Sequence, residues 1–379
     1  MVWNKANAAV LIHERHFGES GRNPGQFRLP RHICALPDGN LCISDTVNQR
    51  LQVVTPEGEF MYSIGKLGAG PGELRGPSGV ACENGMLFCV EGGNHRVQKL
   101  ALADGAPLGR AGSHGSKKNG ELWCPHGVAI SKGHAFVADY INGRVVVFDC
   151  SNMEHLRTFG ARGSEEGQLE YPCGIAVKGE EVYVAEYGNH RISVFTKRGN
   201  FERIIGSEGK APGQFYQPRC APLTRCAPLA RPVCARAWRR TGTPARTPAE
   251  RSPMPVRTRA ASRRGLLFVR GWLLVTEPKR LQVLAPDGEV RQTIDLPGAG
   301  QLWGACKDES RAYVTDIRAG QAKVFVLNIV GTQYDDGKGN TEAQNAAAAK
   351  AAEAAAKLKE WKEARAASTK KADAPPDVT

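Results

Sequence analysis

The sequence lacks a long apolar run, a secretion signal and the common catalytic signatures. No window approaches the ~18 consecutive apolar residues that a membrane-spanning helix needs, so we expect no membrane span. Residues 1–18 contain only a short apolar stretch and no small-residue cleavage site, which argues against secretion. The patterns G-x-S-x-G, Walker A and H-E-x-x-H are missing, so the hydrolases, nucleotidases and zinc proteases that carry them are not indicated.

The sequence also lacks a C-x-x-C motif. The chain has 11 cysteines, an odd number, and none of them forms a C-x-x-C pair. Several, including Cys42, Cys89 and Cys173, stand inside apolar runs, where free cysteine behaves as a small buried hydrophobe. We therefore expect reduced structural thiols, a cytoplasmic location, and no metal or other cofactor.

Acidic residues are scarce in one segment, and this distorts the charge of the whole chain. Lys and Arg number 51 against 38 Asp and Glu, which gives a net charge of +13 and would favour a nucleic-acid partner. Residues 220–264, however, hold 11 Arg and one acidic residue, so this segment supplies most of the excess. The charge therefore does not identify a nucleic-acid-binding domain in the rest of the chain.

What the sequence does contain is a repeated cassette. Each copy runs from an apolar residue and glycine through a Gly-rich loop to a proline, then through two apolar segments to an acidic residue, Asn-x-Arg and a third apolar segment. The acidic markers of the four clear copies, 46, 48 and 47 residues apart, are Asp45, Glu91, Asp139 and Glu186. The matching arginines are Arg50, Arg96, Arg144 and Arg191.

The fifth copy is interrupted. Its acidic marker, Glu277, lies 91 residues after Glu186, almost twice the period. Removing residues 220–264 restores a spacing of 46 and brings Gly265 into register with Gly174. We therefore predict a low-complexity Arg/Pro-rich insertion at 220–264, which is either a basic arm or a translated intron. A weaker sixth copy follows at residues 304–326.

Each repeat contains four short apolar runs separated by turn residues, which is typical of four strands. In the fourth repeat the runs are Gly174–Val177, Val182–Ala185, Ile192–Phe195 and Phe201–Ile205. Because such runs are apolar on both faces, each small sheet needs cover on both sides, which radial stacking provides. Six such repeats predict an all-β, six-bladed β-propeller over residues 8–330. The sixth repeat lacks a fourth strand, so we expect residues 8–16 to complete its sheet.

Residues 341–379 are predicted to be a tail outside the propeller. Ala, Lys and Glu dominate residues 343–367, and this composition favours a solvated helix. Residues 370–379 are predicted to be disordered.

The motifs Pro-x-Gly-Ile/Val-Ala, Val-Ala-Asp/Glu and Asn-His-Arg resemble the NHL repeat family of six-bladed propellers, as found in tripartite-motif proteins. The resemblance is closest in repeats two to four; repeats five and six lack Asn-x-Arg. It implies a non-catalytic module that recruits a protein partner, or alternatively an RNA, through one loop-built face. The Cys/His spacing of a RING is missing, so we do not expect this chain to be a ubiquitin ligase itself.

In such a propeller, one face carries the loops before the innermost strands together with the Asn-x-Arg turns. Residues there that vary between repeats are candidate partner contacts: Arg31, His95, His126, Tyr140, Tyr187, His190 and Arg219. The repeated acid and arginine of each unit are instead expected to pair within their own blade and to hold the fold. These expected pairs are Asp45 with Arg50, Glu91 with Arg96, Asp139 with Arg144, and Glu186 with Arg191.

A weaker resemblance leaves an enzyme as a further alternative. Residues 125–129, with Asn142-Gly143-Arg144, look like a stretch of the peptidyl-hydroxyglycine amidating lyases, which hold a central zinc with three histidines. The positions equivalent to His126 in the other repeats are Arg31, Ser78, Cys173, Arg219 and Trp303. Because zinc needs three or four converging ligands, we expect no zinc site here.

Overall fold

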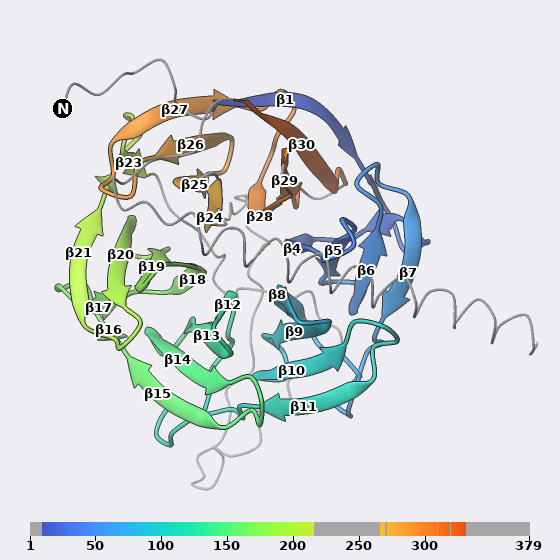
Figure 1. The fold of residues 1–379 in the computed structure, drawn as a ribbon, viewed down its shortest axis with the longest axis horizontal. Coiled ribbons are helices and arrows are strands. Elements are labelled where there is room, and N and C mark those ends of the chain that lie inside the picture. The colour runs from blue at the N-terminus through green and yellow to red at the C-terminus, as the bar shows by residue number, and fades with distance from the viewer. Residues whose placement is uncertain (1–9, 216–265, 270, 309, 319, 331–379) are drawn as a thin grey trace, which may run out of the picture.

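The computed structural model describes residues 10–215 and 266–330, except 270, 309 and 319. All the secondary-structure elements in this part of the chain are β-strands. Six four-stranded antiparallel sheets surround a central axis, with the innermost strand of each sheet beside the axis and the outermost strand along the circumference (Figure 1). The predicted six-bladed propeller is therefore confirmed.

Blades one to three follow one another in sequence. Blade one comprises β4 (Pro30–Ala35), β5 (Leu41–Asp45), β6 (Arg50–Val54) and β7 (Phe60–Ile64). Blade two comprises β8 (Pro77–Glu83), β9 (Met86–Glu91), β10 (Arg96–Ala101) and β11 (Pro107–Ala111). Blade three comprises β12 (Val128–Ser131), β13 (His134–Asp139), β14 (Arg144–Asp149) and β15 (His155–Phe159).

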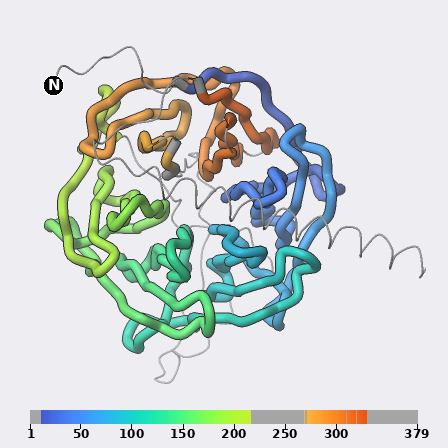
Figure 2. Tube along the Cα trace, viewed as in Figure 1, coloured from blue at the N-terminus to red at the C-terminus, as the bar shows by residue number. Residues whose placement is uncertain are grey.

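The chain then completes the ring in a single circuit (Figure 2). Blade four comprises β18 (Pro172–Lys178), β19 (Glu181–Glu186), β20 (Arg191–Thr196) and β21 (Phe201–Ile205). Blade five comprises β24 (Leu266–Val269), β25 (Trp272–Thr276), β26 (Arg280–Leu284) and β27 (Val290–Asp295). Blade six comprises β28 (Leu302–Lys307), β29 (Arg311–Asp316), β30 (Lys323–Val330) and a strand from the other end of the chain.

That last strand is β1 (Val10–Phe17), which pairs antiparallel with β30 from Val10 opposite Val330 to Phe17 opposite Val324. The prediction that the N-terminal segment completes the sixth sheet is confirmed. Pairing β1 with β30 closes the ring and protects the edge of β30, which would otherwise be open to pairing with another chain.

The Gly-rich loops contain short parallel pairings that the sequence patterns did not predict. β2 (Glu19–Ser20) pairs with β3 (Gln26–Phe27), β16 (Ala161–Arg162) with β17 (Gln168–Leu169), and β22 (Ser207–Glu208) with β23 (Gln214–Phe215). Each pairing folds the loop back on itself, so the loop enters the next blade in a fixed direction.

The core lies between neighbouring blades, where side chains from both faces of each sheet interdigitate. Strands such as β5 and β9 are buried at all or nearly all positions, as their unbroken apolar runs predict. Cys42, Cys89 and Cys173 are buried free thiols, as expected.

Two predicted segments lie outside the described residues: the insertion at 220–264 and the tail at 341–379. Within the described residues there is no helix long and apolar enough to cross a membrane.

Candidate functional site

Each Asn-x-Arg motif forms a polar network around the acid that ends the second strand of its blade. In blade two the buried Glu91 carboxylate accepts hydrogen bonds from Arg96 Nε at 2.7 Å and Asn94 Nδ2 at 2.6 Å. Arg96 also donates to the carbonyls of Gly70 and Glu73 in the Gly-rich loop. The predicted ion pair is therefore present, and it ties this loop to the blade.

The same pair recurs around the ring. The N–O distances are 3.0 Å for Arg50–Asp45, 2.9 Å for Arg144–Asp139, 2.8 Å for Arg191–Glu186 and 3.0 Å for Arg280–Glu277. Burial raises the pKa of Asp45 and of Asp139, against the opposing effect of their hydrogen bonds. Because these arginines are occupied inside the fold, they offer little to a partner.

In blades one and two the middle residue of Asn-x-Arg links its blade to the next one. It has positive φ, 59° at Gln49 and 54° at His95. Gln49 Oε1 accepts a hydrogen bond from the Gly76 N–H at 2.6 Å, and His95 Nδ1 accepts one from the Cys124 N–H at 2.9 Å. His95, a predicted contact residue, is thus half-buried and engaged between blades two and three.

The His95 imidazole is neutral at physiological pH. Burial, together with His114, whose ring centroid lies 4.5 Å away, lowers the pKa of His95 to about 4. Neutrality is also what the hydrogen bond requires, since an accepting Nδ1 carries no proton.

Side chains from opposite blades meet at the propeller axis. His126 comes from the loop before β12 and Trp303 from β28 in the opposite blade, yet their ring centroids are 6.3 Å apart. The Arg31 guanidinium carbon lies 5.0 Å from the Trp303 ring centroid, within the range of a cation–π contact. These three residues occupy equivalent positions in their blades and form what we call the axial cluster.

Tyr140 was predicted to face the surface, and this is wrong, because only 1% of it is exposed. Its ring stacks on the His126 imidazole, with centroids 4.4 Å apart and planes at 9°, and it also packs against Tyr171. His126 is buried as well, with 5% exposed, so it too cannot be the open contact residue that was predicted. Both rings therefore lie beneath the surface of the Asn-x-Arg face.

Two of the repeats match a known family model. The NHL repeat model matches residues 122–148 and 169–195, which include the Asn-x-Arg motifs of blades three and four. This chain carries NHL repeats. Protein brain tumor of Drosophila melanogaster is 29% identical over 160 residues, which cover 40% of this chain and 14% of that protein. RING finger protein nhl-1 of Caenorhabditis elegans is 38% identical over 65 residues, which cover 17% of this chain and 7% of that protein. Each match spans a small part of the relative's length.

Solved structures share the fold of this NHL propeller. A gluconolactonase from Xanthomonas campestris aligns with a TM-score of 0.53 at 15% identity, covering 81% of this chain and 88% of that chain. At that identity the likeness shows a common propeller fold alone.

The remaining predicted contact residues of the NHL propeller have mixed environments. Tyr187 is half-buried, and its ring centroid lies 6.0 Å from that of Tyr171. His190 is also half-buried, and its Nε2 lies 3.8 Å from the Glu208 carboxylate. Arg219 lies outside the described residues.

Sequence reasoning missed Trp123, which is 41% exposed at the loop before β12. Its ring meets His114 edge to face, with centroids 5.2 Å apart. A signal was available: the position two residues before the repeated proline is Arg28, Arg75 and Trp123 in the first three blades, so it varies as a contact position would.

The axial cluster does not fit the zinc of the amidating lyases. The described positions equivalent to His126 hold arginine, serine, cysteine and tryptophan, so they cannot supply three histidines. Within the described ranges, no three His, Cys, Asp or Glu side chains are grouped so as to hold a metal ion.

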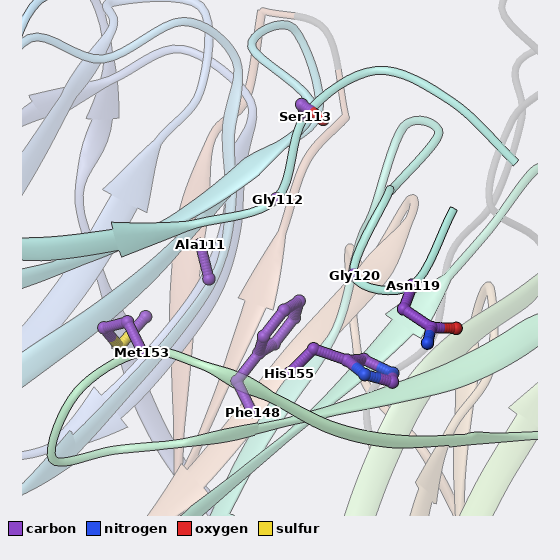
Figure 3. A pocket seen from close by; sticks show the side chains of 8 residues that line it. All are labelled: Ala111, Gly112, Ser113, Asn119, Gly120, Phe148, Met153 and His155. Carbon is purple, nitrogen blue, oxygen red and sulfur yellow. The ribbon is translucent and has the colours of Figure 1, made fainter. Parts of the chain in front are cut away.

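An open hollow of about 270 Å³ lies between the outer parts of blades two and three (Figure 3). A hydrogen bond that recurs in other blades is also missing from blade three. In blade one, Gln52 Oε1 accepts a hydrogen bond from the Gly25 N–H of the Gly-rich loop at 3.0 Å, and blades two and five repeat this tether. Val146 holds the equivalent position in blade three and cannot accept it. The lining shares no residue with the axial cluster: Ala111, Gly112, Ser113, Asn119, Gly120, Phe148, Met153 and His155.

Proposed function

We propose that this NHL propeller is a non-catalytic binding module that recruits a protein partner through its Asn-x-Arg face. The supporting observation is a contrast within that face: the motif residues repeat from blade to blade, whereas the exposed residues beside them differ. Exposed Trp123 stands on the face with the exposed cations Arg28, Arg75, Lys279 and Arg318. Tryptophan and arginine are the residues most enriched in protein-binding hot spots, and these cations favour an acidic partner surface.

The construction of the loops also favours binding. In blades one to five the Gly-rich loop is tied to its own blade by an arginine, as Arg96 does with the carbonyls of Gly70 and Glu73. Loops that are already fixed lose little conformational entropy when a partner docks on them. A rigid face with varied side chains therefore suits specific recognition.

Site-directed photo-crosslinking tests this proposal. A photoreactive phenylalanine analogue replaces Trp123 on the face or, as a matched control, Leu108, which is 52% exposed on the outermost strand β11. We expect RNase-resistant protein adducts from position 123 and few from position 108. Equal adducts from both positions, or none from position 123, would contradict recruitment through this face.

RNA is a second candidate because stackable rings lie beside cations on the same loop. Exposed Trp123 and His114 are close to the exposed Lys117 and Lys118 in sequence. Single-stranded RNA binds through stacking on aromatic rings and through salt-sensitive contacts to phosphate. Binding of a single-stranded RNA pool that weakens steeply with salt and with Trp123→Ala would favour this candidate over a protein partner.

A further inference from the structure

Arg31 differs from the motif arginines of the same face. Each motif arginine donates to a carboxylate and to loop carbonyls, whereas the Arg31 guanidinium has no ion pair or hydrogen bond to any described residue. Its Nε is buried and has no hydrogen-bond partner, although the residue as a whole is only half-buried. Its guanidinium lies instead over the Trp303 ring, at 5.0 Å.

No described acidic side chain balances the charge of Arg31, whereas each motif arginine is paired with an acid of its own blade. Removing charged and polar groups from water costs free energy unless an opposite charge or a hydrogen bond replaces the water. The other described positions equivalent to Arg31 are Ser78, His126, Cys173 and Trp303, none of which carries a carboxylate. The acids of the face are already held by their motifs, as Asp45 is by Arg50 and Asn48.

We propose that Arg31 and Trp303 form a carboxylate-binding site at the propeller axis, which receives a Glu or Asp side chain of the partner. A guanidinium is planar and carries its N–H donors in its own plane, where a planar carboxylate accepts two of them side by side. Bound in this way, the carboxylate supplies the negative charge that Arg31 lacks. This inference rests on the proposed protein-binding function.

A carboxylate fits the site better than a phosphate does. Arg31 is the only Lys or Arg at the described axial positions. It lies over the flat, apolar ring of Trp303, which is itself buried, so the half-buried Arg31 is the residue that a carboxylate can reach. Phosphate carries more charge and is usually held by several cations or by backbone N–H groups at a helix N-terminus. One guanidinium therefore matches a single planar anion.

Fluorine NMR of the full chain labelled with 5-fluorotryptophan tests the site without knowledge of the partner. The chain has 6 Trp, and the Trp303 signal is assigned by its loss in Trp303→Phe. The probes are N-acetylglutamate amide, its neutral isostere N-acetylglutamine amide, and inorganic phosphate. We expect a saturable shift of the Trp303 signal with the glutamate probe, and a response to the other two at least about tenfold weaker.

Variants define the role of Arg31. Arg31→Ser, which copies Ser78 of blade two, is expected to weaken the response at least about tenfold, and Arg31→Lys about threefold or more, because ammonium lacks the planar fork. The matched control is Arg28→Ser, which removes an exposed arginine of the same loop and should change the response by less than about twofold. The dispersed fluorine signals of each variant report whether it folds, and Arg31→Lys serves as the test if Arg31→Ser does not.

Several outcomes would overturn the site. These are an equal response to the glutamate and glutamine probes, a response to phosphate alone, no shift of the Trp303 signal, or an unchanged response in Arg31→Ser. Crosslinking from position 123 separates this inference from the proposed function. A partner captured at undiminished yield by Arg31→Ser would contradict the carboxylate site and leave the proposed function intact. A wild-type chain that captures no partner would contradict the function, while the probe titration still decides whether Arg31 binds carboxylate.

Discussion

Two rings of residues lie on the same face of the propeller, and they differ in how they use charge. In the outer ring, each motif arginine meets a buried acid of its own blade, as Arg96 meets Glu91 at 2.7 Å. In the inner ring, at the axis, the equivalent positions hold unlike residues, and Arg31 has Trp303 beneath it instead of an acid. The outer ring therefore serves the fold. In the inner ring most of the described residues are buried, but the half-buried Arg31 has no ion pair with a described residue.

Breaking the outer ring should have the largest effect. In Arg96→Met the buried Glu91 carboxylate loses its cation, so we expect the free energy of unfolding to fall by about 3–5 kcal/mol. Urea denaturation measures this loss. The control is Lys66→Met, which removes a largely exposed partner of Glu73 and should cost less than about 1 kcal/mol. A loss below about 1 kcal/mol in Arg96→Met would show that the motif is not structural.

Removing the inter-blade link should have an intermediate effect. His95→Gly copies Gly143 of blade three and leaves the Cys124 N–H without its acceptor, which should cost about 1–2 kcal/mol in the same assay. His95→Gln copies Gln49 of blade one, whose amide oxygen accepts the equivalent bond, and should cost less than about 1 kcal/mol. Equal stability of the two variants would show that the hydrogen bond from the Cys124 N–H does not contribute to the free energy of unfolding.

The same link predicts an acid sensitivity. The pKa of His95 is about 4 in the folded chain against 6.5 for free histidine, so the unfolded chain binds the proton more readily. The stability that neutral His95 contributes is complete above pH 6.5 and is lost as the pH falls toward 4. The urea midpoint should therefore change less between pH 7 and pH 5 in His95→Gln than in the wild type. The same change in both proteins would show that His95 does not cause the acid sensitivity.

The exposed part of the face should show the smallest effect on stability. Trp123→Ala removes an exposed ring, so we expect the melting temperature to change little while the amount of partner that co-purifies with the chain falls about tenfold or more. A matched Leu108→Ala variant on the rim should leave both properties unchanged. A large fall in melting temperature for Trp123→Ala would place this residue in the core instead.

The repeat predicts most of the fold, because each blade is built from local apolar runs and turns. The closure of the ring by β1 was also predictable, since the sixth repeat lacks a strand that the first residues can supply. The parallel pairings in the Gly-rich loops were not, because two-residue ladders leave no apolar pattern of their own.

The candidate site was harder to predict because its contacts join different blades. Tyr140 is covered by His126 and Tyr171, and His126 in turn meets Trp303, more than 170 residues away in sequence. The direction of His95 depends on a turn with positive φ, which aims its ring at the next blade rather than at solvent. Neither effect can be read from one repeat alone.

Two arginines of blade one provide the most direct test of the contrast between the rings. The measurement is the free energy of unfolding and the crosslinking yield from position 123, determined together for Arg50→Met and Arg31→Ser. We expect Arg50→Met to lose several kcal/mol, because it leaves the buried Asp45 unpaired, and Arg31→Ser to keep its stability within about 1 kcal/mol and lose the partner. Equal losses of stability in the two variants, or undiminished crosslinking in Arg31→Ser, would contradict the division between structural motif arginines and a binding arginine at the axis.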